Sequence, residues 1–208
     1  MKATKSLKAA LVILCLLHLV PTKAQDVKSL WMSMPSKMTQ YLDDDMKRTL
    51  VDGGNGHVEV KNLLGETTVL DTLTADFMQV KLNQATMLQL KALDTDSGKR
   101  EVCVVRTFTA PEGESTATLY DADWNLVGTI KLPTMAETLL QKPDTLSEAA
   151  YTELKSQITM VMTRATLAPD NKNIKISPSI PLTDKEQQKR LKALLVQKEL
   201  KWNGETFK

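Results

Sequence analysis

The sequence predicts an α+β fold: a curved antiparallel sheet of short, hairpin-connected strands with two to four helices packed on one face. Between about residues 57 and 131, short segments in which apolar and polar side chains alternate are separated by turns rich in Asp, Asn and Gly. This close spacing leaves no room for the long crossovers that parallel strands need. On both sides of this run, apolar residues recur with helical spacing.

The composition is that of an ordinary globular protein. The chain has 208 residues, of which 42% are hydrophobic and 25% are charged. These proportions exclude collagenous, disordered and disulfide-rich classes. Aromatic residues make up only 4%, which argues against a stacking surface for single-stranded nucleic acid.

Residues 1–24 have the pattern of a secretory signal peptide. Lysines precede an apolar run over residues 9–20, Pro21 ends it, and small residues allow cleavage near Ala24. The run is too short for a typical membrane-spanning helix, and no later segment approaches that length. We therefore expect export to the periplasm, cell surface or extracellular space, with no transmembrane segment in the mature chain.

Removal of the leader changes the charge of the protein. The full chain carries 27 Lys and Arg against 25 Asp and Glu, a net charge of +2. Four of the bases and none of the acids lie in residues 1–24, so the remainder has 23 bases, 25 acids and a net charge of −2. A nucleic-acid partner is therefore not expected.

Two helical stretches are predicted after the leader. Val27, Leu30, Trp31 and Met34 follow the spacing of one helical face, which Pro35 ends. A second stretch runs from about residue 36 to 51. It could break near residues 43–45, whose three aspartates would then occupy the first turn of a separate helix, where the helix dipole favours acids.

Seven short strands are predicted next, and residues 101–109, rich in Val, give the strongest signal. The segments are 57–61, 67–70, 78–82, 88–92, 101–109, 116–120 and 126–131.

The C-terminal part mixes helices and strands. Capping-box patterns at residues 145–148 and 183–186 predict two helix starts. Strands are expected at 158–167 and around 174–176, and the tail alternates at 199–202 before a turn and Phe207 close a last hairpin. We expect a single domain over 25–208, and a boundary between two units, if present, would fall near 132–144.

Two segments of the chain resemble each other. A strand ending in Ala-Pro-acid and then a returning strand occur after Arg106 and again after Arg164. Either hairpin chemistry converged, because proline fixes φ and the acid favours the turn, or two related strand pairs lie in one curved sheet.

The sequence offers few residues that could bind a metal ion or act as a nucleophile. Outside the leader only His57 and Cys103 remain, which cannot form a closed zinc site. Cys103 lies in a Val-rich strand and is expected to be a small buried residue. Residues 121–125 resemble the start of a calcium loop, but Leu126 replaces the required Gly, so a turn is predicted. We expect no catalytic residues, no metal and no cofactor.

Methionine and aromatic residues near the N-terminus suggest a binding surface. Trp31, Met34, Met38 and Tyr41 could line an apolar groove for a lipid, a peptide or an envelope protein, because thioethers adapt to varied ligands. The alternative is that these side chains simply belong to the core.

A family resemblance spans most of the chain after the leader. The residues that carry it are 30–35 (LWMSMP), 41–42 (YL), Arg48, Leu50, 101–107 (EVCVVRT), 120–124 (YDADW), 201–204 (KWNG) and Phe207. The chain resembles a family of uncharacterised secreted proteins of Gram-negative gut-type bacteria, a domain of unknown function. The resemblance implies export and an antiparallel sheet, and it supplies no site residues.

Three functional hypotheses remain from the sequence. The first is a non-enzymatic, exported binding or envelope-associated module. The second is a carboxylate-dependent hydrolase of envelope polymers, which needs two acids facing each other in a cleft, one with a raised pKa. The third is a structural interaction subunit whose exposed strand edge pairs with a partner.

Overall fold

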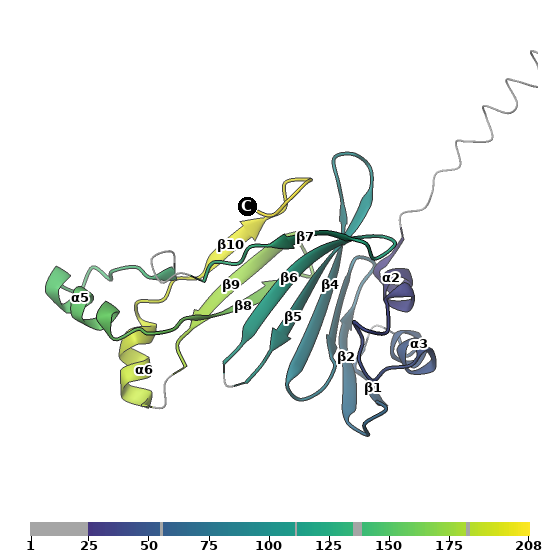
Figure 1. Cartoon of the computed structure of the whole chain (residues 1–208), viewed down its shortest axis with the longest axis horizontal. Coiled ribbons are helices and arrows are strands. Elements are labelled where there is room, and N and C mark those ends of the chain that lie inside the picture. The colour runs from purple at the N-terminus through teal and green to yellow at the C-terminus, as the bar shows by residue number, and fades with distance from the viewer. Residues whose placement is uncertain (1–24, 55, 111, 135–138, 182–183) are drawn as a thin grey trace, which may run out of the picture.

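The computed structural model describes residues 25–54, 56–110, 112–134, 139–181 and 184–208 (Figure 1). The predicted leader and its cleavage site at Ala24 lie outside the described residues. The described part contains four helices and two antiparallel sheets, which confirms the α+β fold class. None of the described helices combines the length and the apolar character needed to span a bilayer.

The larger sheet has seven strands in the order of the chain, and each strand pairs with the next. This arrangement confirms the predicted antiparallel hairpins. The strands are β1 (Val58–Lys61), β2 (Thr67–Leu73), β3 (Phe77–Lys81), β4 (Thr86–Asp94), β5 (Arg100–Phe108), β6 (Glu114–Asp121) and β7 (Leu126–Ile130).

The remaining strands form a second sheet and do not extend the first. It contains β8 (Met162–Leu167), β9 (Asn173–Ser179) and β10 (Lys198–Lys201) in the order β10-β9-β8. The two Ala-Pro-acid hairpins therefore belong to different sheets. A bridge between Trp202 and Phe207 confirms the predicted last hairpin.

The helices are α2 (Val27–Ser33), α3 (Asp44–Asp52), α5 (Glu148–Ser156) and α6 (Lys185–Lys192). The predicted helical stretch 36–51 is interrupted near residues 43–45, as the alternative prediction stated. Asp43 caps α3 by accepting a hydrogen bond from the Met46 amide at 2.8 Å, and two acids follow in the first turn. Helix α5 begins later than predicted, because Ser147 provides its N-terminal cap.

The two faces of the seven-stranded sheet bury different partners. The helix face, which carries Leu88, Leu90, Val102 and Val104, packs against α2 and α3. The opposite face, which carries residues such as Cys103, packs against the second sheet. The sequence predicted that the helices pack on one face of the sheet. Helices α5 and α6 instead form a third cluster with Ile180 at the other end of the molecule (Figure 1).

Buried polar side chains connect the two sheets. The Gln89 Oε1 atom accepts from the Leu167 amide at 3.0 Å, and the Lys91 Nζ atom donates to the Pro169 carbonyl at 3.0 Å. Lys91 also pairs with Asp76 at 2.9 Å. These bonds satisfy groups that burial would otherwise leave without partners, and they fix where the second sheet docks.

Candidate functional site

A groove opens on the helix face where the helices end. Helices α2 and α3 contact chiefly β1 to β4, and the groove lies beyond them, with lining residues from β5 and β6. The groove has a volume of about 410 Å³. We call it the Arg106 groove, and it is lined by Lys37, Met38, Gln40, Thr86, Val104, Arg106, Phe108, Thr118, Tyr120 and Trp124.

Arg106 lies on the floor of this groove. Strand alternation places it on the same face as Val104 and Phe108, opposite Leu88 and Thr116 on the neighbouring strands. The side chain is half-buried, and burial lowers the pKa of Arg106 from its ordinary value. An arginine guanidinium nevertheless stays protonated at neutral pH, so the groove carries a partly desolvated positive charge.

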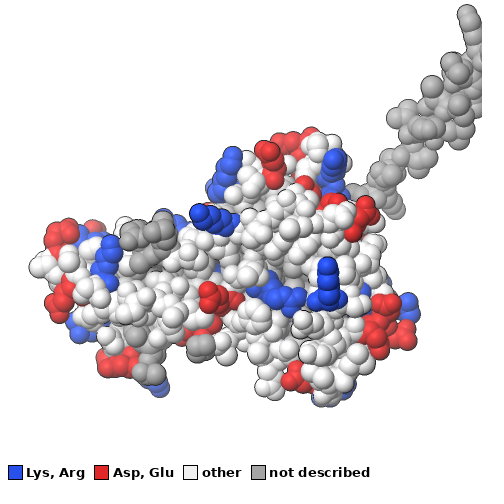
Figure 2. All heavy atoms as spheres, viewed as in Figure 1, with Lys and Arg blue, Asp and Glu red and all other residues white. Residues whose placement is uncertain are grey.

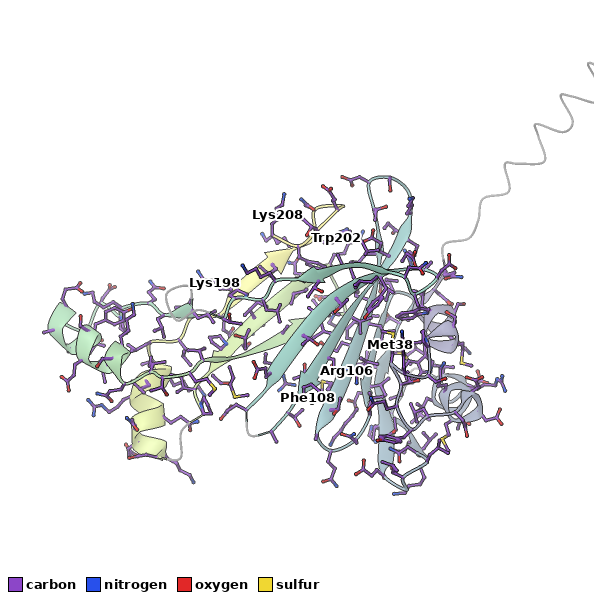
Figure 3. The ribbon with its side chains drawn as sticks, in the orientation of Figure 1. Met38, Arg106, Phe108, Lys198, Trp202 and Lys208 are labelled. Atoms are coloured by element: carbon purple, nitrogen blue, oxygen red, sulfur yellow. The ribbon has the colours of Figure 1, made fainter. Side chains whose placement is uncertain are left out.

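The guanidinium of Arg106 has unused hydrogen-bonding capacity. One Nη2 N–H group donates to the Met38 carbonyl oxygen, and no described carboxylate lies within salt-bridge distance. A guanidinium has five N–H donors in a flat fork. Figure 3 shows Arg106 between Phe108 and Met38 on the sheet face that faces the viewer, and Figure 2 shows basic atoms gathered at that position.

Aromatic side chains form one wall of the groove. The rings of Tyr120 and Trp124 lie 5.7 Å apart at a tilt of 51°, and the Trp124 Nε1 atom donates to the Ser33 hydroxyl at 3.1 Å. Trp124 has a φ of +65°, a conformation that few residues other than glycine adopt. The turn that holds it is the one predicted at residues 121–125.

Asp121 organises this turn. Its carboxylate accepts from the backbone amides of Asp123 and Asn125 at 3.0 and 2.8 Å and from the Asn125 side chain at 2.9 Å. These hydrogen bonds, that of the Asn125 side chain foremost, lower the pKa of Asp121. The carboxylate therefore serves the turn that presents Trp124 to the groove.

The buried Lys47 holds the backbone that leads to the opposite wall of the groove, where Met38 lies. The Lys47 Nζ atom donates to the carbonyls of Met32 and Met34 at 3.0 and 2.9 Å. Desolvation lowers the pKa of Lys47, and the nearby Asp44 opposes part of this effect. Lys47 thus fixes the chain that leads from α2 into the wall.

The four residues predicted to bind a ligand do not lie together in one groove. Trp31 and Met34 are buried in the core, with 0% and 2% exposure. Met38 is half-buried and lines the Arg106 groove. Tyr41 is 46% exposed and does not line it. Only Met38 therefore belongs to the groove.

Sequence reasoning did not nominate Arg106. The signal that could have identified it is a cation at an alternating position in an otherwise apolar strand, directly after Val102 and Val104 on the same face. A charge on such a face requires either a partner or a functional reason.

Among the described residues, one cavity lined by three acids comes nearest to the arrangement that the hydrolase hypothesis needs. Burial, together with the charge of Asp121, raises the pKa of Glu101. Glu101 lines a separate cavity of about 370 Å³ together with Asp96 and Glu205, whereas Asp121 is not among its lining residues. The two acids that influence each other therefore do not face each other across one cavity.

The two residues considered for nucleophilic or metal chemistry do not line the groove. Cys103 is fully buried on the opposite face of β5, and burial raises the pKa of its thiol. A thiol in this state is a packing residue and a poor nucleophile. His57 is exposed and contacts Glu59, with 2.9 Å between its Nε2 atom and the carboxylate.

Comparisons with other proteins give a family and a fold. Residues 19–207 match a family model described as "Protein of unknown function (DUF3256)". The solved structure of a domain of an uncharacterised protein from Porphyromonas gingivalis W83 is similar, with a TM-score of 0.72 and 18% sequence identity. The similarity covers 89% of this chain and 98% of that chain, and it extends to the fold alone. No curated protein matches the chain.

Proposed function

The chain belongs to the DUF3256 family, whose description assigns no activity, and we propose from the Arg106 groove that the protein is an exported binding module for an anionic ligand with an apolar part. One observation carries this proposal: the half-buried guanidinium of Arg106, on the floor of a groove, has no described carboxylate partner. Export is inferred from the leader pattern of residues 1–24 and forms part of the same proposal.

The positive end of the groove suits a carboxylate or a phosphate. The planar guanidinium of Arg106 can donate two parallel N–H bonds to either group. Thr86 and Thr118 lie beside it on the floor, and their hydroxyls can donate to a third oxygen. Partial burial strengthens such contacts because fewer water molecules screen them.

The remainder of the groove suits an apolar or ring-shaped group. Tyr120, Trp124 and Phe108 present aromatic surface, and Met38 adds an adaptable thioether. The volume of about 410 Å³ is within the range of small-ligand sites. The same groove thus offers charge recognition at the floor and apolar contact at the walls.

The first test compares soluble amphiphilic anions with a neutral analogue. Hexyl phosphate and hexanoate are titrated against the protein by calorimetry, with hexanol as the uncharged comparison. Because hydrogen bonds to charged groups contribute about 1.5–3 kcal/mol, Arg106→Gln is expected to weaken binding of both anions by about 10- to 100-fold. Arg106→Lys keeps the charge but not the fork, so an intermediate loss is expected.

The matched control is Arg48→Gln, because Arg48 is exposed on α3 and paired with Asp45. It should leave binding unchanged. Anions that bind Arg106→Gln as tightly as the unaltered protein, or that fail to bind the unaltered protein at all, would contradict the proposal. Thermal unfolding of each variant shows whether the fold is retained.

A further inference from the structure

Large apolar side chains are exposed at one end of the seven-stranded sheet. The turns β1–β2, β3–β4 and β5–β6 all lie at this end, the lower edge of the sheet in Figure 1. Leu63 and Leu64 are 64% and 59% exposed at the first turn, and Phe108 is 52% exposed where β5 ends. We call this region, residues 41, 62–66, 82–85 and 108–110, the turn end.

The β1–β2 turn is built to hold its two leucines outward. The buried Asn62 side chain accepts from the backbone amides of Leu64 and Glu66, both at 3.0 Å. Gly65 has a φ of +76°, which closes the turn. A turn needs polar or small residues, so an ordered turn that presents two adjacent leucines to solvent is costly unless they contact something.

Tyr41 is attached to the same turn. Its carbonyl accepts from the Leu63 amide at 2.9 Å, and its φ of +68° is rare for a residue with a side chain. The Tyr41 side chain is 46% exposed, and its backbone is hydrogen-bonded to that of Leu63. A tyrosine next to exposed leucines is typical of proteins that meet the boundary between water and lipid, where its ring is apolar and its hydroxyl remains hydrated.

The groove and the turn end are continuous. Phe108 belongs to both, and Met38 and Gln40 of the groove wall lead directly along the chain to Tyr41. A phospholipid has the same order of chemistry, with a phosphate above an apolar layer. The exposed Lys61 and Lys81 end the strands β1 and β3 next to the turns, where cations favour an anionic surface, although Glu66 lies in the same region.

We propose that the turn end inserts into the surface of an anionic phospholipid bilayer while Arg106 binds a lipid phosphate in the groove. The inference rests on the proposed function and names the source of the anion. Insertion of Leu63, Leu64 and Tyr41 would remove apolar surface from water, and this peripheral contact requires no spanning segment.

The test measures co-sedimentation with two kinds of vesicle, phosphatidylcholine alone and an equimolar mixture with phosphatidylglycerol. The double variant Leu63→Ser/Leu64→Ser is expected to reduce binding to the mixed vesicles by at least about tenfold, because two leucine side chains no longer leave water. Arg106→Gln should lower binding to both kinds of vesicle, because both lipids carry a phosphate, and the larger loss is expected for the mixed vesicles, since phosphatidylglycerol has no choline cation beside its phosphate.

Leu126→Ser is the matched control, because Leu126 is 65% exposed on β7, outside the turn end. It should bind the mixed vesicles like the unaltered protein. Equal losses from Leu126→Ser and from the double variant would overturn the inference, since a general loss of apolar surface would then explain both.

Hexyl phosphate separates this inference from the proposed function. The leucine variant should still bind hexyl phosphate, since its groove is intact. If the unaltered protein binds hexyl phosphate but not the mixed vesicles, the membrane inference is wrong and the proposed function is retained. If it binds neither, both fall. A loss of self-association in the leucine variant, measured by light scattering without vesicles present, would assign the turn end to a second copy of the chain instead.

Discussion

Replacing Trp31 with alanine is expected to lower the free energy of unfolding by about 3–5 kcal/mol, the range for removing a large aromatic side chain from a core. The ring is fully buried among α2, α3 and the helix face, and its Nε1 atom donates to the Lys47 carbonyl at 3.0 Å. The variant loses the packing of the indole and the hydrogen bond that the indole donates to that carbonyl. Urea denaturation followed by circular dichroism measures the change.

Trp124→Ala is the matched comparison. Trp124 is partly exposed at the rim of the groove, so we expect a stability loss of only about 1 kcal/mol, near the average for single substitutions. Its effect on hexyl phosphate binding should be the larger one. If Trp31→Ala retained its stability and lost ligand binding instead, Trp31 would be a binding residue, as the sequence hypothesis proposed.

Lys91→Met is expected to lower the free energy of unfolding by about 1.5–3 kcal/mol, because it removes a hydrogen bond and an ion pair made by a charged group. The ammonium of Lys91 is almost fully buried and holds both the Pro169 carbonyl of the second sheet and the carboxylate of Asp76. Asp76 is 41% exposed and can be hydrated after the change, so the loss should stay below that of a fully buried broken ion pair. Urea denaturation again provides the measurement.

The same variant should change the pH dependence of stability. Burial alone would raise the pKa of Asp76, but the hydrogen bond and charge of Lys91 outweigh it and hold the pKa below 3.8. The unfolded state therefore binds more protons just below 3.8, and this contribution to stability is lost as the pH falls through the folded-state pKa. Lys91→Met should show a smaller loss on acidification. Lys175→Met, an exposed site on β9, should match the unaltered protein in both respects.

The sequence predicted the seven-stranded sheet well because every pairing in it is local. Alternation marks each strand, and turn residues such as Asp121 and Gly98 mark the points where the chain reverses. The second sheet could not be separated from the first in this way. Its docking depends on contacts such as that of Gln89 with Leu167, 78 residues apart, for which no local pattern exists.

The candidate site was harder to predict for a related reason. Apolar spacing identified Trp31 and Met34 as one helical face, but spacing does not say whether that face is covered. Helices α2 and α3 contact chiefly β1 to β4, and Arg106 becomes a groove residue because it lies beyond them on β5. Without the fold, a single arginine in a strand has no distinguishing context.

The sequential strand order of the large sheet also has a kinetic consequence. The entropic penalty of closing a loop grows with its length, and contacts across 78 residues close a far longer loop than the 10 residues between Gln79 and Gln89. Closing the longer loop therefore adds about 2 kcal/mol to the free-energy barrier of folding, because the entropic penalty grows with the logarithm of loop length. The seven-stranded sheet should therefore acquire hydrogen-exchange protection during refolding before β8 does. The chain would then assemble the face that carries the Arg106 groove before the second sheet packs on the opposite face.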